Sequence, residues 1–142
     1  RLMTPTGALV CSRRLMLYWI VFLGAGIGGA LRHGVNIVAA RWFGHAFPFE
    51  TLIVNVPGSF LMGLCAGYFA FRPGVDQHVR LFLTTGILGG FTTYSAFSLD
   101  AALLIERHSY GLAAGYMLGT VFACVAALFL GIAVFNETPR LP

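Results

Sequence analysis

Polar side chains recur at one-turn spacing within the apolar segments of this sequence. Thr51 and Asn55 lie four residues apart in one such segment, and Tyr116 and Thr120 lie four apart in another. An amide or hydroxyl group in hydrocarbon is costly unless it has a hydrogen-bond partner. Such residues can join neighbouring helices, or they can line a polar path for a solute. Because aligned polar residues occur on several segments, we favour the path.

The stretch GGFTTYSAFSLD, residues 89–100, mixes glycines and hydroxyl side chains with aromatic residues. Glycine and β-branched threonine propagate a helix poorly, so the stretch predicts an interruption in a membrane-spanning helix. An interrupted helix frees backbone carbonyls that can bind a cation. After the interruption, Tyr94 and Phe97 share a helix face, and their electropositive ring edges together with the Asn55 amide would suit a small anion. The simpler alternative is that the two rings only pack.

Titratable residues are scarce in the middle of the apolar segments. Glu50 and Asp100 lie near segment ends, and Arg32 lies late in the first segment, where its side chain would reach the membrane interface. A proton-coupled transporter of this size needs a titratable group at mid-membrane depth. The sequence has no such carboxylate, no nucleotide-binding glycine loop and no set of nucleophile, base and acid. These absences argue against a pump and against an enzyme.

The composition places these residues in an integral membrane protein. Of the 142 residues, 58% are hydrophobic and 10% are charged, whereas a soluble domain has about 25% charged residues. The basic residues are all arginine and gather at segment ends, which indicates contact with lipid head groups and no nucleic-acid partner. Four apolar runs approach or exceed the length that spans a bilayer: 15–31 (continuing towards 40), 51–71, 81–99 and 109–136. The predicted fold class is an all-α membrane protein with four transmembrane helices, the third broken at mid-membrane.

The predicted organisation is one four-helix channel domain over residues 16–137, followed by a short tail at 138–142. Residues 1–15 are too polar to span, and we interpret them as a leader or as a misassigned start before Met16. Four spans place both ends of the domain on one side of the membrane. Without the first fifteen residues, the arginines are nearly balanced between the two sides. This balance permits insertion in both orientations, or a single weakly specified topology.

Small residues recur every four positions in the apolar runs, as at Gly24 and Gly28 or Gly86 and Gly90. This spacing predicts close packing of helix backbones. Four helices enclose little interior, so a solute path would more readily form between subunits. We therefore expect an oligomer.

Three motifs make the sequence resemble a known family. They are GAGIGGALRHG at residues 24–34, TLIVNVPGSFLMG at 51–63 and TTGILGGFTTYSAFSLD at 84–100. In this order, and on a chain of this length, they are similar to the motifs of the Fluc (CrcB) family of fluoride channels. The resemblance extends over nearly the whole channel domain. It implies an antiparallel, dual-topology homodimer in the bacterial inner membrane, with two fluoride pores at the dimer interface.

The same resemblance implies roles for individual residues. Backbone carbonyls of Gly89 and Thr92 would hold a structural Na⁺ at the centre of the dimer. Asn55 would line the pore, and Tyr94 and Phe97 would be the paired aromatic residues that face the ion. The remaining polar residues of the pore would be Thr51, Ser95, Tyr116 and Thr120, and Arg32 would lie at a vestibule.

The implied function is passive export of F⁻ from the cytoplasm, which protects the cell from fluoride. Three residues depart from the family's pattern: Tyr94 replaces the usual Phe, Ala96 replaces the usual Thr, and Pro57 follows Asn55 by two residues. Pro57 removes a helical hydrogen bond, so a kink in the second span is expected. The alternative function is a small multidrug-type, proton-coupled transporter, which should carry a glutamate in its first span. This first span has none.

Overall fold

The structure is a computed structural model that describes residues 5–44, 47–72 and 74–136, with side chains described from Arg13 to Phe135 within these ranges. Within these ranges, four helical stretches are long and apolar enough to cross a membrane, as predicted. Helix α1 (Pro5–Phe43) contains the first span, α2 (Phe49–Phe71) forms the second, and α6 (Tyr110–Asn136) contains the fourth. The third span consists of α3 (Gln77–Leu81), the π-helical segment η1 (Phe82–Leu88), α4 (Gly89–Phe91) and α5 (Tyr94–Glu106). The chain is therefore an all-helical, multi-pass membrane protein.

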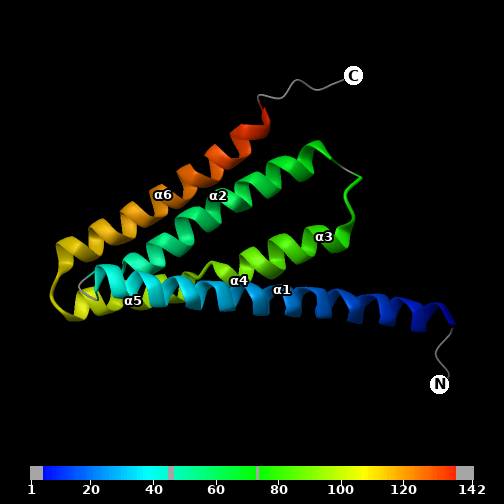
Figure 1. Cartoon of the computed structure of the whole chain (residues 1–142), viewed down its shortest axis with the longest axis horizontal. Coiled ribbons are helices and arrows are strands. Elements are labelled where there is room, and N and C mark those ends of the chain that lie inside the picture. Colours follow the sequence, from blue (N-terminus) through cyan, green and yellow to red (C-terminus); the bar gives the residue numbers. More distant parts are fainter. Residues whose placement is uncertain (1–4, 45–46, 73, 137–142) are drawn as a thin grey trace.

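The helices form an open array rather than a closed bundle. Figure 1 shows α2 and α6 side by side along most of their length, while α1 runs along the third span. The N-terminal end of α1 and the C-terminal end of α6 point to the same side, as an even number of spans requires. The dimeric assembly and its dual topology stay predictions.

The third span is interrupted near its middle, as predicted, but the interruption is limited to two residues. Thr92 (φ −75°, ψ 155°) and Thr93 (φ −148°, ψ 117°) have extended backbones, whereas Gly89 is helical (φ −65°, ψ −36°). The prediction that the double glycine contributes to the break is therefore wrong, and the threonines alone depart from the helix. Threonine favours extended backbone because its β-branched side chain is crowded in a helix.

The glycines instead allow the first and third spans to approach closely. A Cβ atom on Gly90 would lie 2.5 Å from the carbonyl oxygen of Ala25, and one on Gly24 would lie 2.8 Å from the Cα of Gly86. Helices in lipid associate largely through van der Waals packing and hydrogen bonds, so small residues at such crossings bring the backbones together. The close crossing fixes the position of the break relative to α1.

The second and fourth spans pack in the same way. Gly63 on α2 lies against the carbonyl of Leu128, and Gly131 on α6 lies against the carbonyl of Phe60. Pro57 is exposed on α2, and the helix continues through it from Phe49 to Phe71. The kink expected at Pro57 stays a prediction.

The predicted domain boundaries are only partly covered by the described residues. Helix α1 is continuous from Pro5, so residues 5–15 are helical together with the start of the first span. Residues 1–4 and the tail predicted at 138–142 lie outside the described residues. The interpretation of residues 1–15 as a leader or misassigned start stays a prediction.

Candidate functional site around the helix break

Asn55 on α2 holds the extended part of the third span in place. Its Oδ1 accepts a hydrogen bond from the Thr93 N–H at 2.8 Å, and its Nδ2 donates to the Thr93 carbonyl at 2.9 Å. Asn55 is buried. Its two hydrogen bonds therefore satisfy backbone groups of Thr93 that lack helical partners at the interruption and could not bind water in lipid. A carboxamide has two N–H donors, so one of them remains for a further partner.

The side chain of Thr93 begins the next helix. Its Oγ1 accepts a hydrogen bond from the Ala96 N–H at 3.2 Å and shares another with the Ser95 hydroxyl at 3.1 Å. This is the usual role of threonine at a helix N-cap. Thr93 therefore contributes its backbone to Asn55 and its side chain to α5, and it was not among the predicted site residues.

The break frees the two carbonyls that were predicted to hold Na⁺. In a regular helix, the Thr93 N–H would donate to the Gly89 carbonyl and the Ala96 N–H to the Thr92 carbonyl. Both donors are used elsewhere, by Asn55 and by the Thr93 hydroxyl. Among the described residues, no other hydrogen bond to either carbonyl replaces them. Carbonyl oxygens are suitable ligands for a hard cation, so the residues present fit Na⁺.

A groove of about 290 Å³ lies beside the break, between α2, α5 and α6. Four of the predicted pore residues line it together: Asn55, Tyr94, Phe97 and Thr120. The rings of Tyr94 and Phe97 are 5.4 Å apart between centroids. Phe97 is buried and also packs on Tyr116, whereas Tyr94 is 78% exposed at the open side of the groove. The Thr120 hydroxyl is buried and has no hydrogen-bond partner within the described chain.

Two other predicted pore residues meet at a carboxylate that sequence reasoning missed. Thr51 Oγ1 donates to Asp100 Oδ2 at 2.6 Å, and the Tyr116 hydroxyl donates to the same oxygen at 3.1 Å. Asp100 was placed near a segment end and given no role. Its position three residues after Phe97, on the same face of α5, was the available signal.

The remaining two predicted residues, Arg32 and Ser95, lie on the other side of the break. They line a separate cavity of about 400 Å³ together with Asn36, Thr93, Ala96 and Leu99. Arg32 shares this cavity with Thr93 of the break, and the expectation that its side chain reaches the membrane interface stays a prediction. Helix α1 is longer than the apolar run in the sequence, since it begins at Pro5.

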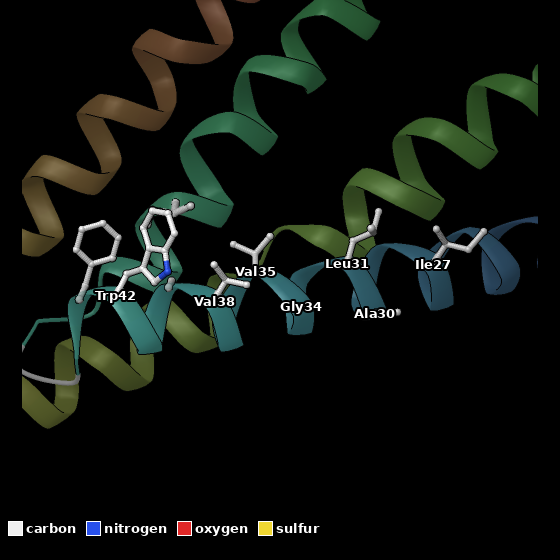
Figure 2. Close-up of a pocket in the computed structure, with 10 residues that line it drawn as sticks. Ile27, Ala30, Leu31, Gly34, Val35, Val38 and Trp42 are labelled. Carbon is white, nitrogen blue, oxygen red and sulfur yellow. The ribbon is translucent and has the colours of Figure 1, made fainter.

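A further cavity is apolar and lies apart from these groups. It has a volume of about 890 Å³ and extends along α1 towards Ile53 of α2. Figure 2 shows Ile27, Leu31, Val35, Val38 and Trp42 along this wall. It contains no hydrogen-bonding side chain apart from the indole of Trp42, so it is not the place where an ion would bind.

The groove by the break can hold a small anion without trapping it. It presents amide, hydroxyl and aromatic-edge groups, and its lining includes no charged residue. Within the described part of the chain, no cluster of three histidine, cysteine or acidic side chains could hold a metal. Amide, hydroxyl and aromatic-edge groups can coordinate an ion through their dipoles.

The fold and the site define a class: a four-span membrane protein whose third span is broken by two extended residues beside a polar groove. The sequence matches the family described as "CrcB-like protein, Camphor Resistance (CrcB)" over residues 19–132. The chain belongs to this family.

Curated relatives are similar over nearly their whole length. A protein of Rhodopseudomonas palustris (strain BisB5), named fluoride-specific ion channel FluC, is 60% identical over 121 residues, covering 85% of this chain and 98% of the relative. A protein of Nitrobacter hamburgensis is 56% identical over 86% of this chain and 98% of the relative. One of Methylobacterium nodulans is 57% identical over 83% and 94%, respectively. The former is named fluoride-specific ion channel FluC 2 and the latter fluoride-specific ion channel FluC.

Proposed function

We propose that this chain is a fluoride-selective channel through which F⁻ leaves the cytoplasm passively. The observation that carries the proposal is the groove, where the free N–H of Asn55, the unpartnered hydroxyl of Thr120 and the rings of Tyr94 and Phe97 line one uncharged space. The names of the relatives support the same function. An ion channel is not an enzyme, and no observation favours a proton-coupled transporter.

Selectivity for fluoride would come from replacing the water around a small ion. Each donor in the groove can take the place of one water hydrogen bond, and the two ring edges add further positive potential. Because none of these groups carries a full charge, binding stays weak enough for the ion to leave. A larger halide would fit such a narrow set of donors less well.

The driving force for export is the membrane potential. Fluoride enters an acid-exposed cell as neutral HF and dissociates at cytoplasmic pH, where the anion is trapped. An inside-negative potential contributes about 2.3 kcal/mol per charge per 100 mV to its exit. A passive pore is therefore sufficient, and no coupled ion or nucleotide is required.

A second copy of the chain would complete the pore. The groove is open on the side where Tyr94 is 78% exposed, so one chain alone leaves the ion in contact with lipid. We propose an antiparallel homodimer in which the partner covers this side. Two freed carbonyls on each chain, those of Gly89 and Thr92, would then hold Na⁺ at the centre. Bound there, Na⁺ would supply positive charge that fixes the two breaks together.

The test is fluoride efflux from liposomes that contain the purified full-length protein. Valinomycin and a K⁺ gradient set the potential, and fluoride and chloride electrodes follow release from matched vesicles. Fast fluoride release without chloride release is the expected result. Equal release of both ions would disprove selectivity, and release of neither would disprove the channel.

A matched pair of variants tests the groove within the same assay. Thr120→Val removes the unpartnered hydroxyl and keeps the side-chain shape, and we expect fluoride efflux to slow about tenfold. Thr85→Val makes the same change on the exposed side of the third span and should leave efflux unchanged. Equal rates in the two variants would show that the groove is not the path.

A further inference from the structure

The fourth span carries a thiol on the same face as its polar residues. Tyr116, Thr120 and Cys124 follow one another at intervals of four residues on α6, and residues four apart lie on the same side of a helix. Cys124 lines the groove beside the break together with Thr120 and Asn55. The passage of fluoride proposed above makes no use of its sulfur.

The groove contains hydroxyl groups without partners near this thiol. Thr120 is only 4% exposed, yet its hydroxyl has no hydrogen-bond partner within the described chain. On the α2 side of the groove, Ser59 also forms no hydrogen bond among the described residues. A buried hydroxyl without a partner is costly, so an occupant that contacts Thr120 is expected here. This observation is independent of the sulfur, and it indicates a ligand beside the thiol.

The end of the groove that carries Cys124 is suited to a soft cation. Cys124 lies two turns beyond Tyr116, roughly 12 Å along the helix axis. Phe97 packs on Tyr116, so its electropositive ring edge is at the other end. The lining includes no charged residue that would repel a cation. Thiolate sulfur is a soft ligand that selects soft metal ions such as Cu⁺, whereas oxygen ligands suit hard ones.

We propose that Cys124 is a binding site for a soft monovalent metal cation of the class of Ag⁺ and Cu⁺. The thiol releases its proton to water, the sulfur–metal bond forms with an electron pair of the sulfur, and no atom changes its oxidation state. Oxygen atoms of Ser59 and Thr120 complete the coordination. A metal held here occupies the groove and withdraws the Thr120 hydroxyl from F⁻, so it closes the path. Metal binding does not depend on the proposed channel function, but the closing of the path rests on it.

Cys65 provides a comparison within the same chain. It lies on α2 six positions after Ser59, which turns its side chain about 120° away from the face that carries Ser59. It is not among the residues that line the groove. An ion such as Ag⁺ enters lipid only at high cost. Silver should therefore reach Cys124 through the groove and should not reach Cys65.

The test is fluoride efflux from liposomes in chloride-free buffer, with silver nitrate as the probe. Two full-length variants form a matched pair: Cys11→Ser/Cys65→Ser retains only the thiol of Cys124, and Cys11→Ser/Cys124→Ser retains only that of Cys65. Each variant is compared with its own rate before silver is added. We expect Ag⁺ to slow efflux through the first variant at least about tenfold and to leave the second unchanged. Dithiothreitol, which removes the metal, should restore the rate.

The first variant decides the question alone if serine at position 124 prevents folding. Its single thiol is that of Cys124, so slowing that dithiothreitol reverses can only come from this site. Efflux that silver does not slow in this variant would overturn the proposal. Equal slowing of both variants would overturn it as well.

Silver uptake separates this inference from the proposed function. A silver-ion electrode measures uptake by each variant in liposomes, and we expect tight uptake only where Cys124 is present. Absence of uptake by the first variant would remove the metal site. Fluoride efflux that continues with silver bound would leave the channel in place and overturn the closing of the path. Tight uptake at Cys124 in a protein that releases no fluoride would keep the metal site and remove the channel.

Discussion

Thr51 on α2 and Tyr116 on α6 donate hydrogen bonds to the same carboxylate oxygen, that of Asp100 on α5. Three helices are therefore joined at one atom. Both hydroxyls are held by a fixed acceptor, and their role as pore-lining residues stays a prediction. The Asp100 carboxylate thus positions the side chains of Thr51 and Tyr116.

Replacing Asp100 by leucine should destabilise the protein, because two buried hydroxyls lose their acceptor. We expect the free energy of unfolding to fall by about 2 kcal/mol or more. Asp100→Asn keeps an oxygen at the same place and should cost less. Thermal unfolding in detergent measures both, with Glu106→Leu as the control, since Glu106 is an exposed acid on the same helix. Equal effects of Asp100→Leu and Glu106→Leu would contradict the role assigned to the shared oxygen.

Asn55→Asp should disable the protein although it changes few atoms. Aspartate still accepts the Thr93 N–H, but it cannot donate to the Thr93 carbonyl, and it adds a negative charge beside the groove. We expect fluoride efflux to fall at least about a hundredfold, because a buried charge repels the anion. Efflux from liposomes provides the measurement, and Ser59→Asp, on the same lining but without the two backbone bonds, tests charge alone. Substantial efflux through Asn55→Asp would show that the break does not need both bonds.

Thr93→Val should weaken the start of α5. The substitution keeps the β-branched shape and removes the oxygen that caps Ala96. Loss of an N-cap costs about 1 kcal/mol, so the melting temperature should fall by a few degrees. Thr93→Ser retains the oxygen and should restore most of the loss. Identical melting temperatures for the valine and serine variants would argue against the cap.

Gly89 and Gly90 should respond very differently to alanine. A Cβ on Gly90 would collide with the Ala25 backbone at 2.5 Å, whereas one on Gly89 would have only an ordinary contact, 3.5 Å from the Thr84 carbonyl oxygen. We expect Gly90→Ala to yield little folded protein and Gly89→Ala to express and elute normally on size-exclusion chromatography. Comparable yields for the two variants would contradict the close crossing of α1 and the third span.

The number of spans and the place of the break could be predicted because both follow from local composition. Apolar length determines a span, and adjacent β-branched threonines propagate a helix poorly, although the pair Thr84 and Thr85 remains helical within η1. The role of Gly90 could not be predicted in the same way, since glycine serves equally for a break and for a close approach. Only the position of Ala25 in space decides between the two.

The grouping of site residues was harder to predict than their identities. Asn55, Tyr94, Phe97 and Thr120 line one groove, but Ser95 follows Tyr94 directly and lines another cavity. Successive residues of a helix point about 100° apart, so moving a hydroxyl by one position in the sequence places it on a different side of the helix. That Arg32 would share a cavity with Ser95 could not be predicted either, because it depends on how α1 packs along the third span.

The hydrogen bonds from Asn55 recognise a peptide group and not a side chain. Their partners are the N–H and C=O of residue 93, which every amino acid except proline provides. The two hydrogen bonds that hold the backbone therefore do not depend on which side chains the neighbouring residues carry. Substitutions at residues 94–97 can change the size and polarity of both cavities while Asn55 continues to hold the backbone of the break. Because Asn55 holds the backbone of the break, the side chains around it can change without a change in the helices that carry them.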